Sequence, residues 1–120
     1  ICFDWRFPET ARTLALMGAD LIAHPSNLVL THCPQAMITR CLENRVYAVT
    51  ADRVGVENRM ESLNFMGQSQ IVDPNGNVLY RASMTDEEVH VVRVDLNLAR
   101  EKFLNPHNHI FKDRREDLYH

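Results

Sequence analysis

The sequence predicts an α/β fold, in which strands and helices alternate along the chain. Three observations support this prediction. The first half reads strand, helix, strand, helix, strand, which is the pattern of a layered α/β domain. Apolar residues make up 45% of the 120 residues and charged residues 24%, a balance typical of a globular domain rather than a disordered chain. The segment Asp73-Pro74-Asn75-Gly76 is a strong turn signal, and it predicts a hairpin in the second half.

The first helix is expected from about Pro8 to Met17, after a short apolar segment that ends at Phe3. Pro8 suits the first helical position, because its missing N–H would have no partner there. Glu9 places negative charge near the positive end of the helix dipole. Gly18 is expected to end the helix, since glycine readily takes the left-handed conformation common after helix C-termini.

A buried strand over 20–24 follows, and Pro25-Ser26-Asn27 is expected to break it. A second helix is predicted over 33–44, again with a proline early in its first turn. The next strand, over 46–51, is rich in β-favouring residues.

The second half of the chain is more irregular. Residues 52–66 are polar and have the length of a functional loop. The remaining predicted elements are a hairpin formed by 67–72 and 77–81 around the turn, a strand over 89–95, a short helix over 96–103, and a charged, aromatic arm over 105–120.

Charge and cysteine content exclude several classes of protein. The net charge is −3, with 13 basic and 16 acidic residues, so there is no broad electrostatic footprint for nucleic acid. No apolar run approaches the ~20 residues of a membrane span, so no membrane partner is expected. The three cysteines are an odd count without close pairing, which argues against a disulfide framework and predicts a reducing compartment, most simply the cytoplasm.

The first nine residues carry the most specific motif. Ile1-Cys2-Phe3-Asp4-Trp5-Arg6-Phe7-Pro8-Glu9 resembles the nucleophile motif of the nitrilase superfamily of carbon–nitrogen hydrolases. That motif reads apolar–Cys–x–Asp–x–x–Phe–Pro–Glu and lies at a strand-to-helix turn. Further matches follow in family order: Gly18-Ala19-Asp20, Arg40 with Glu43-Asn44, Arg53-Val54-Gly55, Gly67 to Pro74 with Gly76, and Phe111 to Arg115 with Leu118-Tyr119.

The resemblance implies a four-layer αββα sandwich, of which this chain would form only part. Residues 1–120 would be the C-terminal portion of a single carbon–nitrogen hydrolase domain, with half of the sandwich over 1–104 and a C-terminal arm over 105–120. The chain has no initiator methionine and opens on what looks like the end of a buried strand, so upstream sequence is expected to be missing.

The resemblance also implies a cysteine amidohydrolase that acts on small carboxamides or N-carbamoyl compounds. Cys2 would be the nucleophile, the backbone N–H of Phe3 would stabilise the oxyanion, and no metal or organic cofactor would be needed. The family's glutamate base and its lysine lie upstream of the cysteine, where this chain has only Ile1. The chain alone is therefore expected to have no turnover.

Two residues are candidates for substrate binding, each with an alternative. Arg6 has the planar fork that binds a carboxylate, but it could instead pair with Glu9 at the helix start. Asn27 lies in a loop after a strand, where ligands often bind in layered α/β folds, but Pro-Ser-Asn could simply form a turn. Cys2 itself could be a buried structural cysteine, since cysteine is among the most buried residue types.

Other polar residues are expected to be structural. Asp4 should accept backbone hydrogen bonds at the turn, and Arg40 should pair with Glu43. Asp52 departs from the asparagine often found at its position in the family. Two histidines have a catalytic alternative instead: His24 or His32 could form a protease-like pair with Cys2.

The sequence leaves two other functions open and predicts an oligomer. The chain could be a truncated, non-catalytic homologue that serves as an assembly or binding module. It could also be a metal-binding module, although its histidines and cysteines are scattered rather than closely spaced. A homodimer or larger homo-oligomer is expected in either case, because half of a sandwich exposes one face of its sheet.

Overall fold

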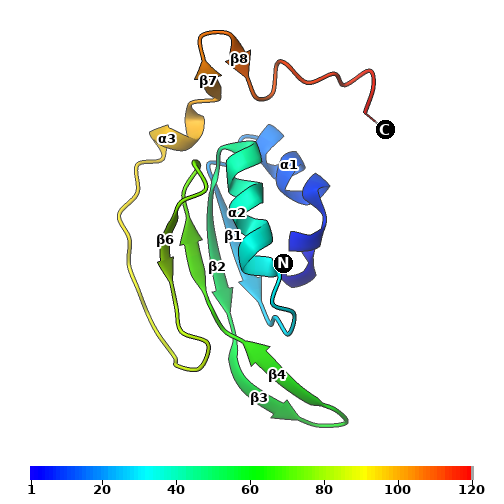
Figure 1. Ribbon diagram of the computed structural model, residues 1–120, viewed down its shortest axis with the longest axis vertical. Helices are drawn as coiled ribbons and strands as arrows, with labels where there is room; N and C mark the ends of the chain where they lie inside the picture. Colours follow the sequence, from blue (N-terminus) through cyan, green and yellow to red (C-terminus); the bar gives the residue numbers. More distant parts are fainter. Residues whose placement is uncertain (120) are drawn as a thin grey trace.

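Two helices cover one face of a four-stranded sheet in the computed structural model, which describes residues 1–119 (Figure 1). The strands lie in the order β1-β2-β5-β6. Their bounds, with those of the helices, are β1 (Leu21–Ser26), β2 (Tyr47–Asp52), β5 (Gln70–Val72), β6 (Val78–Arg81), α1 (Pro8–Leu16) and α2 (Cys33–Asn44). The predicted α/β class is confirmed, as are both helices of the first half.

The sheet is mixed. β1 and β2 run parallel, with His24 opposite Thr50, and α2 is the crossover between them. β2 pairs antiparallel with β5, and β5 pairs antiparallel with β6, so the hairpin predicted around Asp73-Pro74-Asn75-Gly76 is confirmed. Because side chains alternate along a strand, His24 and Thr50 both point to the face that the helices cover.

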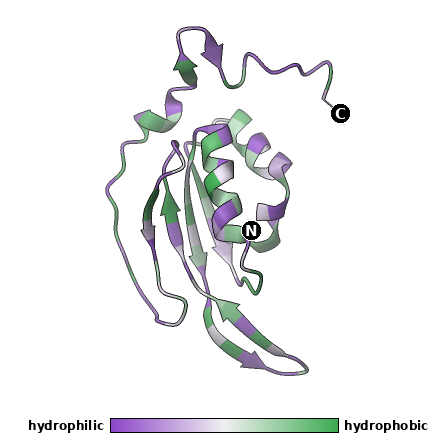
Figure 2. Cartoon of the chain, in the orientation of Figure 1, coloured by the Kyte–Doolittle hydropathy of each residue, from purple (hydrophilic) through white to green (hydrophobic). Residues whose placement is uncertain are grey.

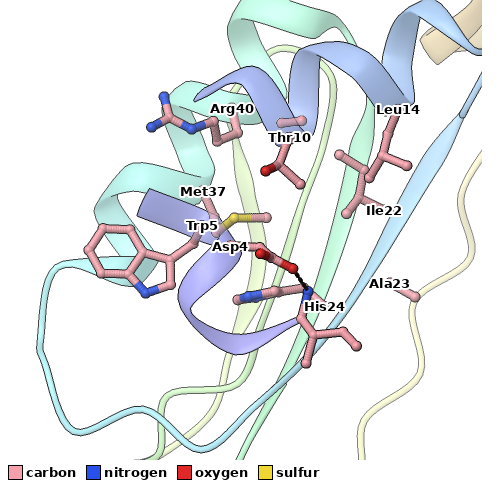
Figure 3. A pocket seen from close by; sticks show the side chains of 11 residues that line it. Asp4, Trp5, Thr10, Leu14, Ile22, Ala23, His24, Met37 and Arg40 are labelled. Atoms are coloured by element: carbon pink, nitrogen blue, oxygen red, sulfur yellow. Dashed lines mark hydrogen bonds and ion pairs between the residues drawn. The ribbon is translucent and has the colours of Figure 1, made fainter. Parts of the chain in front are cut away.

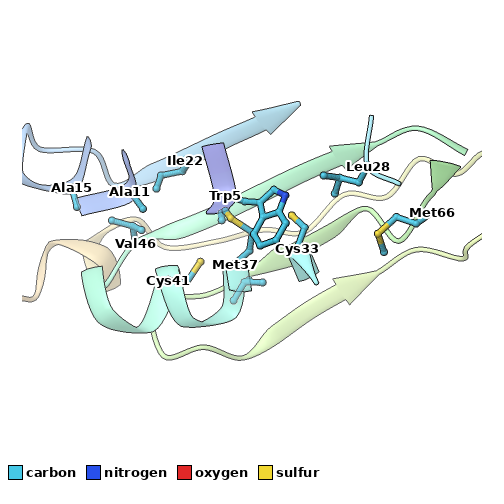
Figure 4. Close-up of a cluster of buried hydrophobic side chains, with 12 residues drawn as sticks. Trp5, Ala11, Ala15, Ile22, Leu28, Cys33, Met37, Cys41, Val46 and Met66 are labelled. Atoms are coloured by element: carbon cyan, nitrogen blue, oxygen red, sulfur yellow. The ribbon is translucent and has the colours of Figure 1, made fainter. Parts of the chain in front are cut away.

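The core lies between the two helices and this face (Figure 4). Its buried members are Trp5, Ala11, Ala15, Ile22, Leu28, Cys33, Met37, Cys41, Val46, Ala48, Met66 and Val72. Figure 2 shows hydrophobic and hydrophilic bands along α2. Its buried residues Cys33, Met37 and Cys41 are spaced four apart, so they form one apolar stripe on the helix. The opposite face of the sheet carries Ala23, Val49 and Ile71, which are exposed or half-buried.

The C-terminal end of α2 is held by two cations. Arg45, in the left-handed conformation with φ +47°, donates to the Glu101 carbonyl at 2.5 Å and to the Asn75 side chain at 2.9 Å. Lys102 Nζ donates to the carbonyls of Asn44 and Arg45 at 2.9 and 2.7 Å. The Lys102 bonds satisfy carbonyls that the end of α2 leaves without partners, and the bonds of both residues fasten the later segment to α2.

The strand predicted over 20–24 is longer than expected, because β1 continues through Pro25 to Ser26. Proline lacks the N–H that a central strand would use. β1 is an edge strand, with β2 as its one neighbour in the sheet, so Pro25 can stand within it.

The irregular loop predicted over 52–66 is wrong. The segment forms a second hairpin of β3 (Val54–Asn58) and β4 (Ser62–Met66), which projects away from the main sheet (Figure 1). The alternation of Val54 and Val56 is a strand signal that the polar residues around it obscured.

The strand predicted over 89–95 is also wrong, because this extended segment joins no ladder within residues 1–119. Val89 and Val91 are 96% and 87% exposed. The predicted helix over 96–103 shortens to α3 (Asn97–Arg100), and a small hairpin of β7 (Phe103–Asn105) and β8 (Asn108–His109) opens the C-terminal segment. No helix within the described residues is long and apolar enough to cross a membrane.

Candidate active site

Cys2 opens a short 3-10 turn, η1 (Cys2–Arg6), which leads directly into α1. Its φ is +42°, in the left-handed region that residues with a Cβ rarely adopt. Such strain costs about 1–3 kcal/mol, and it persists only where surrounding contacts enforce it. The side chain is half-buried and packs on the edge of the core, and the thiol is free.

A side chain of β1 contacts the backbone of this turn. His24 Nε2 lies 2.7 Å from the carbonyl oxygen of Cys2, and His24 Nδ1 lies 3.2 Å from Thr50 Oγ1. A carbonyl only accepts, so Nε2 carries the proton and donates. Burial lowers the pKa of His24, which keeps the ring neutral near pH 7 and leaves Nδ1 to accept from the Thr50 hydroxyl.

Neither histidine considered as a partner for the thiol is placed to act as its base. Both ring nitrogens of His24 are occupied, one by the Cys2 carbonyl and the other by Thr50. His32 is exposed at the start of α2, where it lines a surface hollow with Trp5 and Arg6. The protease-like pairing of Cys2 with His24 or His32 is therefore wrong.

The Phe3 amide lies at the unpaired start of η1. The first backbone hydrogen bond of this turn runs from the Asp4 N–H to the Ile1 carbonyl at 2.9 Å, one residue later. N–H groups that precede the first bonded turn have no partner within the helix, so they are available to an anion.

A small cavity of about 60 Å³ lies behind the turn (Figure 3). Asp4, Trp5, Thr10, His24, Met37 and Arg40 are among the side chains around it. Cys2 does not line this cavity, so the space belongs to the packing between η1, α1 and β1.

The carboxyl ends of β1 and β2 lie beside each other, and Asp52 at the end of β2 is an unusual feature of that edge. Asp52 Oδ1 accepts the Leu28 N–H at 2.7 Å, whereas its buried Oδ2 has no partner among residues 1–119. Burial raises the pKa of Asp52. Asn27, a predicted substrate ligand, is exposed in the loop that begins here.

Of the two arginines near η1, Arg6 is exposed and Arg40 is structural. Arg6 is exposed, with its guanidinium 5.7 Å from the centre of the Trp5 ring. It forms no ion pair with Glu9 in the described chain, so that predicted pair is wrong. The predicted pair of Arg40 with Glu43 is confirmed, at 3.3 Å.

The other two cysteines are inert by comparison. Cys33 and Cys41 are fully buried, and burial raises the pKa of each thiol to about 12. The nearby Asp52 and Cys2 add to the effect at Cys33. Within residues 1–119, no group of three or more His, Cys, Asp or Glu side chains comes together to hold a metal ion.

Sequence reasoning missed the hydrogen-bonded link from Thr50 through His24 to Cys2. The available signal was the periodicity of β1 and β2, which places His24 and Thr50 on one face. That periodicity did not reveal that η1 lies against this face.

Comparisons with known proteins show which family the chain is similar to. The carbon-nitrogen hydrolase family model matches residues 1–102. A nitrilase of Pyrococcus abyssi is 60% identical over 119 residues, which cover 99% of this chain and 44% of that protein. The chain thus spans less than half the length of this curated relative.

Two solved structures share the fold. A carbon-nitrogen hydrolase of Helicobacter pylori superposes with a TM-score of 0.86 at 27% identity, covering 98% of this chain and 45% of that one. A mutant amidase of Nesterenkonia sp., with the acetamide moiety of fluoroacetamide added covalently at its active-site cysteine, gives a TM-score of 0.62 at 30% identity, covering 70% of this chain and 32% of that one. On the family match over 102 of its 120 residues, this chain belongs to the carbon-nitrogen hydrolase family of the nitrilase superfamily.

Proposed function

We propose that the protein containing this chain hydrolyses the carbon–nitrogen bond of a small carboxamide or N-carbamoyl compound through a thioester on Cys2. The observation that carries the proposal is the geometry of Cys2: a free, half-buried thiol at φ +42°, followed at once by a Phe3 amide without a hydrogen-bond partner among residues 1–119. The covalent adduct on the cysteine of the Nesterenkonia amidase supports the same role for Cys2.

The proposed reaction has two steps. In the first, the Cys2 sulfur attacks the amide carbon, and the carbonyl oxygen becomes an oxyanion that the Phe3 N–H stabilises. The C–N bond then breaks, ammonia leaves with the proton that the thiol gave up, and a thioester remains. In the second step, water attacks the thioester, the acid leaves, and the thiol is restored. Two moderate barriers thus replace one high barrier.

The Phe3 amide would contribute appreciably to the rate. One oxyanion donor is worth about 2.7–4 kcal/mol, or roughly 10²–10³ in kcat. Neither His24 nor His32 is placed to take the thiol proton, so the proton acceptor must lie elsewhere. The family resemblance implies a glutamate base and a lysine upstream of the cysteine, and neither has a counterpart among these 120 residues. The chain by itself is therefore proposed to be inactive.

The remaining roles follow the same proposal. Exposed Arg6 and Asn27 are proposed to bind the substrate, on the sides of η1 and β1 respectively. Residues 1–104 are proposed as half of the sandwich of one domain, and 105–120 as an arm that contacts a second copy in a homodimer or larger assembly. The reaction needs no metal or organic cofactor, and the cytoplasm is the proposed location because all three cysteines are free thiols.

The test is ammonia release by the complete protein from a panel of small carboxamides and N-carbamoyl compounds. We expect turnover in the wild type and loss of at least about 10³-fold in Cys2→Ala, whereas the matched control Cys41→Ala should keep its kcat. A folded wild type without turnover on any member of the panel would favour the non-catalytic assembly module.

A further inference from the structure

We infer that His24 is a positioning residue, which sets the direction of the Phe3 N–H by holding the carbonyl oxygen of Cys2. The inference rests on the proposed function, because it concerns the donor that would stabilise the oxyanion. It assigns a task to a buried histidine that takes no part in the proton transfers of the proposed reaction.

The Cys2 carbonyl and the Phe3 amide belong to one peptide unit. Cys2 contributes the C=O and Phe3 contributes the N–H of one planar group, and the described chain has no cis peptide bond. In a planar trans peptide the C=O and the N–H point to opposite sides. Whatever fixes the oxygen of Cys2 therefore fixes the direction of the Phe3 hydrogen.

The group that holds this oxygen is buried and has hydrogen-bond partners at both ring nitrogens. The His24 side chain is only 4% exposed, and its Nε2 lies 2.7 Å from the oxygen. On the other side, Nδ1 meets Thr50 Oγ1 at 3.2 Å, across the β1–β2 register in which these two residues are partners. Ser26 Oγ lies 3.1 Å from Nε2 and 3.3 Å from Nδ1. The Cys2 carbonyl is thus tied to the main sheet through one rigid ring.

η1 needs a contact from outside the turn to hold its conformation. A residue with a Cβ does not hold φ +42° by its own preference. η1 is a five-residue 3-10 turn, whose hydrogen bonds have poorer geometry than those of an α-helix. Without the His24 contact, the Cys2–Phe3 peptide could rotate toward a relaxed conformation, and the Phe3 N–H would then point away from the oxyanion.

The test uses the complete protein and separates the amide donor from the sulfur. His24→Phe keeps an aromatic ring in the core but cannot donate to the Cys2 carbonyl. His24→Gln keeps a side-chain N–H donor. His90→Phe is the matched control, because this exposed ring stacks on Tyr80, lies outside the proposed site and arm, and keeps its aromatic character in the variant. Two rates are measured: kcat for amide hydrolysis, and the modification of Cys2 by methyl methanethiosulfonate, a thiol reagent without a carbonyl group.

We expect His24→Phe to lower kcat by about 10- to 100-fold, somewhat less than the loss of a whole oxyanion donor. KM should change by less than about threefold, because the oxyanion exists only in the transition state and the intermediate. The rate of Cys2 modification should also stay within about threefold, since that reaction forms no oxyanion. His24→Gln should recover kcat to within about fivefold of the wild type, because its amide donates to the same carbonyl.

Three results would overturn the inference. They are an unchanged kcat in folded His24→Phe, a parallel fall of kcat and Cys2 modification, and a His24→Gln variant as slow as His24→Phe. If His24→Phe does not fold, Thr50→Val replaces it, because this isosteric change removes the hydroxyl that orients the ring; an unchanged kcat there also overturns the inference. Cys2→Ala distinguishes the two proposals: if it keeps its rate the proposed function fails, whereas full loss in Cys2→Ala with an unchanged His24→Phe sinks only the role of His24.

Discussion

Iodoacetamide should alkylate only one of the three cysteines, Cys2, when the complete protein is treated at about pH 7.5. This mild treatment tests how far the three thiols differ in ionisation and in access. Cys2 is half-buried at the start of η1, whereas Cys33 and Cys41 are 0% exposed. The contrast follows from ionisation first and from access second, because the thiolate is the reacting species.

The size of the contrast can be worked out from the pKa values. Burial raises the pKa of Cys33 and Cys41 to about 12. At pH 7.5 such a thiol is ionised to roughly 3 parts in 10⁵, against roughly one part in ten for an ordinary thiol of pKa about 8.5. The deficit of about 3,000-fold is offset some 40-fold, because a more basic thiolate is a better nucleophile. A factor of about 10² remains from ionisation alone, and complete burial slows the reaction further.

The assay is a time course of peptide mass spectrometry, with the urea-unfolded protein as the reference in which all three cysteines are accessible. In the native protein, the Cys2 peptide should be modified at least about 10² times faster than the peptides that contain Cys33 and Cys41. In urea the three rates should converge. Equal native rates would refute the account of the two buried thiols. A native Cys2 peptide that stays unmodified while the same peptide reacts in urea would refute the claim that this thiol is accessible.

Two further predictions concern stability, measured by chemical denaturation of the complete protein. Lys102→Met should lower the free energy of unfolding by about 1–3 kcal/mol, because two charge-assisted bonds to the end of α2 are lost. The control Lys112→Met, at an exposed position, should change it by less than about 0.5 kcal/mol. Equal effects of the two substitutions would contradict the role of Lys102. Asp52→Asn should become less stable relative to the wild type as the pH falls from about 7 to 4, because the raised pKa of Asp52 makes its charged form costly above that pKa and the cost vanishes on protonation; a pH-independent difference would show that the carboxyl is not penalised by burial.

Local signals were sufficient to predict both helices of the first half and the hairpin of β5 and β6. Pro8 and Pro34 each mark the first turn of a helix, and α1 and α2 begin within one residue of these prolines. The turn at 73–76 predicts β5 and β6 because proline and Asn-Gly fix the backbone there.

The two wrong predictions concern whether a segment finds a neighbouring strand. The segment over 89–95 has strong β propensity, but a strand needs a neighbour, and the described residues supply none. β3 and β4 pair with each other and project from the body, so their polar sequence resembles that of a loop.

The nucleophile of the candidate site was predicted from the sequence, but the hydrogen bonds around it were not. The motif at 1–9 identified Cys2 and the Phe3 amide as candidates, and these assignments remain predictions. In the link from Thr50 through His24 to the Cys2 carbonyl, His24 is separated in sequence by 22 positions from Cys2 and by 26 positions from Thr50. No local pattern specifies such a link, because it forms only when η1 packs on the face shared by β1 and β2.

The most direct test of the central claim is the mass of the Cys2 peptide during turnover. The complete protein is mixed with excess carboxamide, quenched in acid within the first turnover, and digested. The account predicts that the acyl group of the substrate is attached to Cys2 and is released by hydroxylamine, as a thioester is. Steady ammonia release with an unmodified Cys2 peptide, or with the acyl group on another residue, would contradict it.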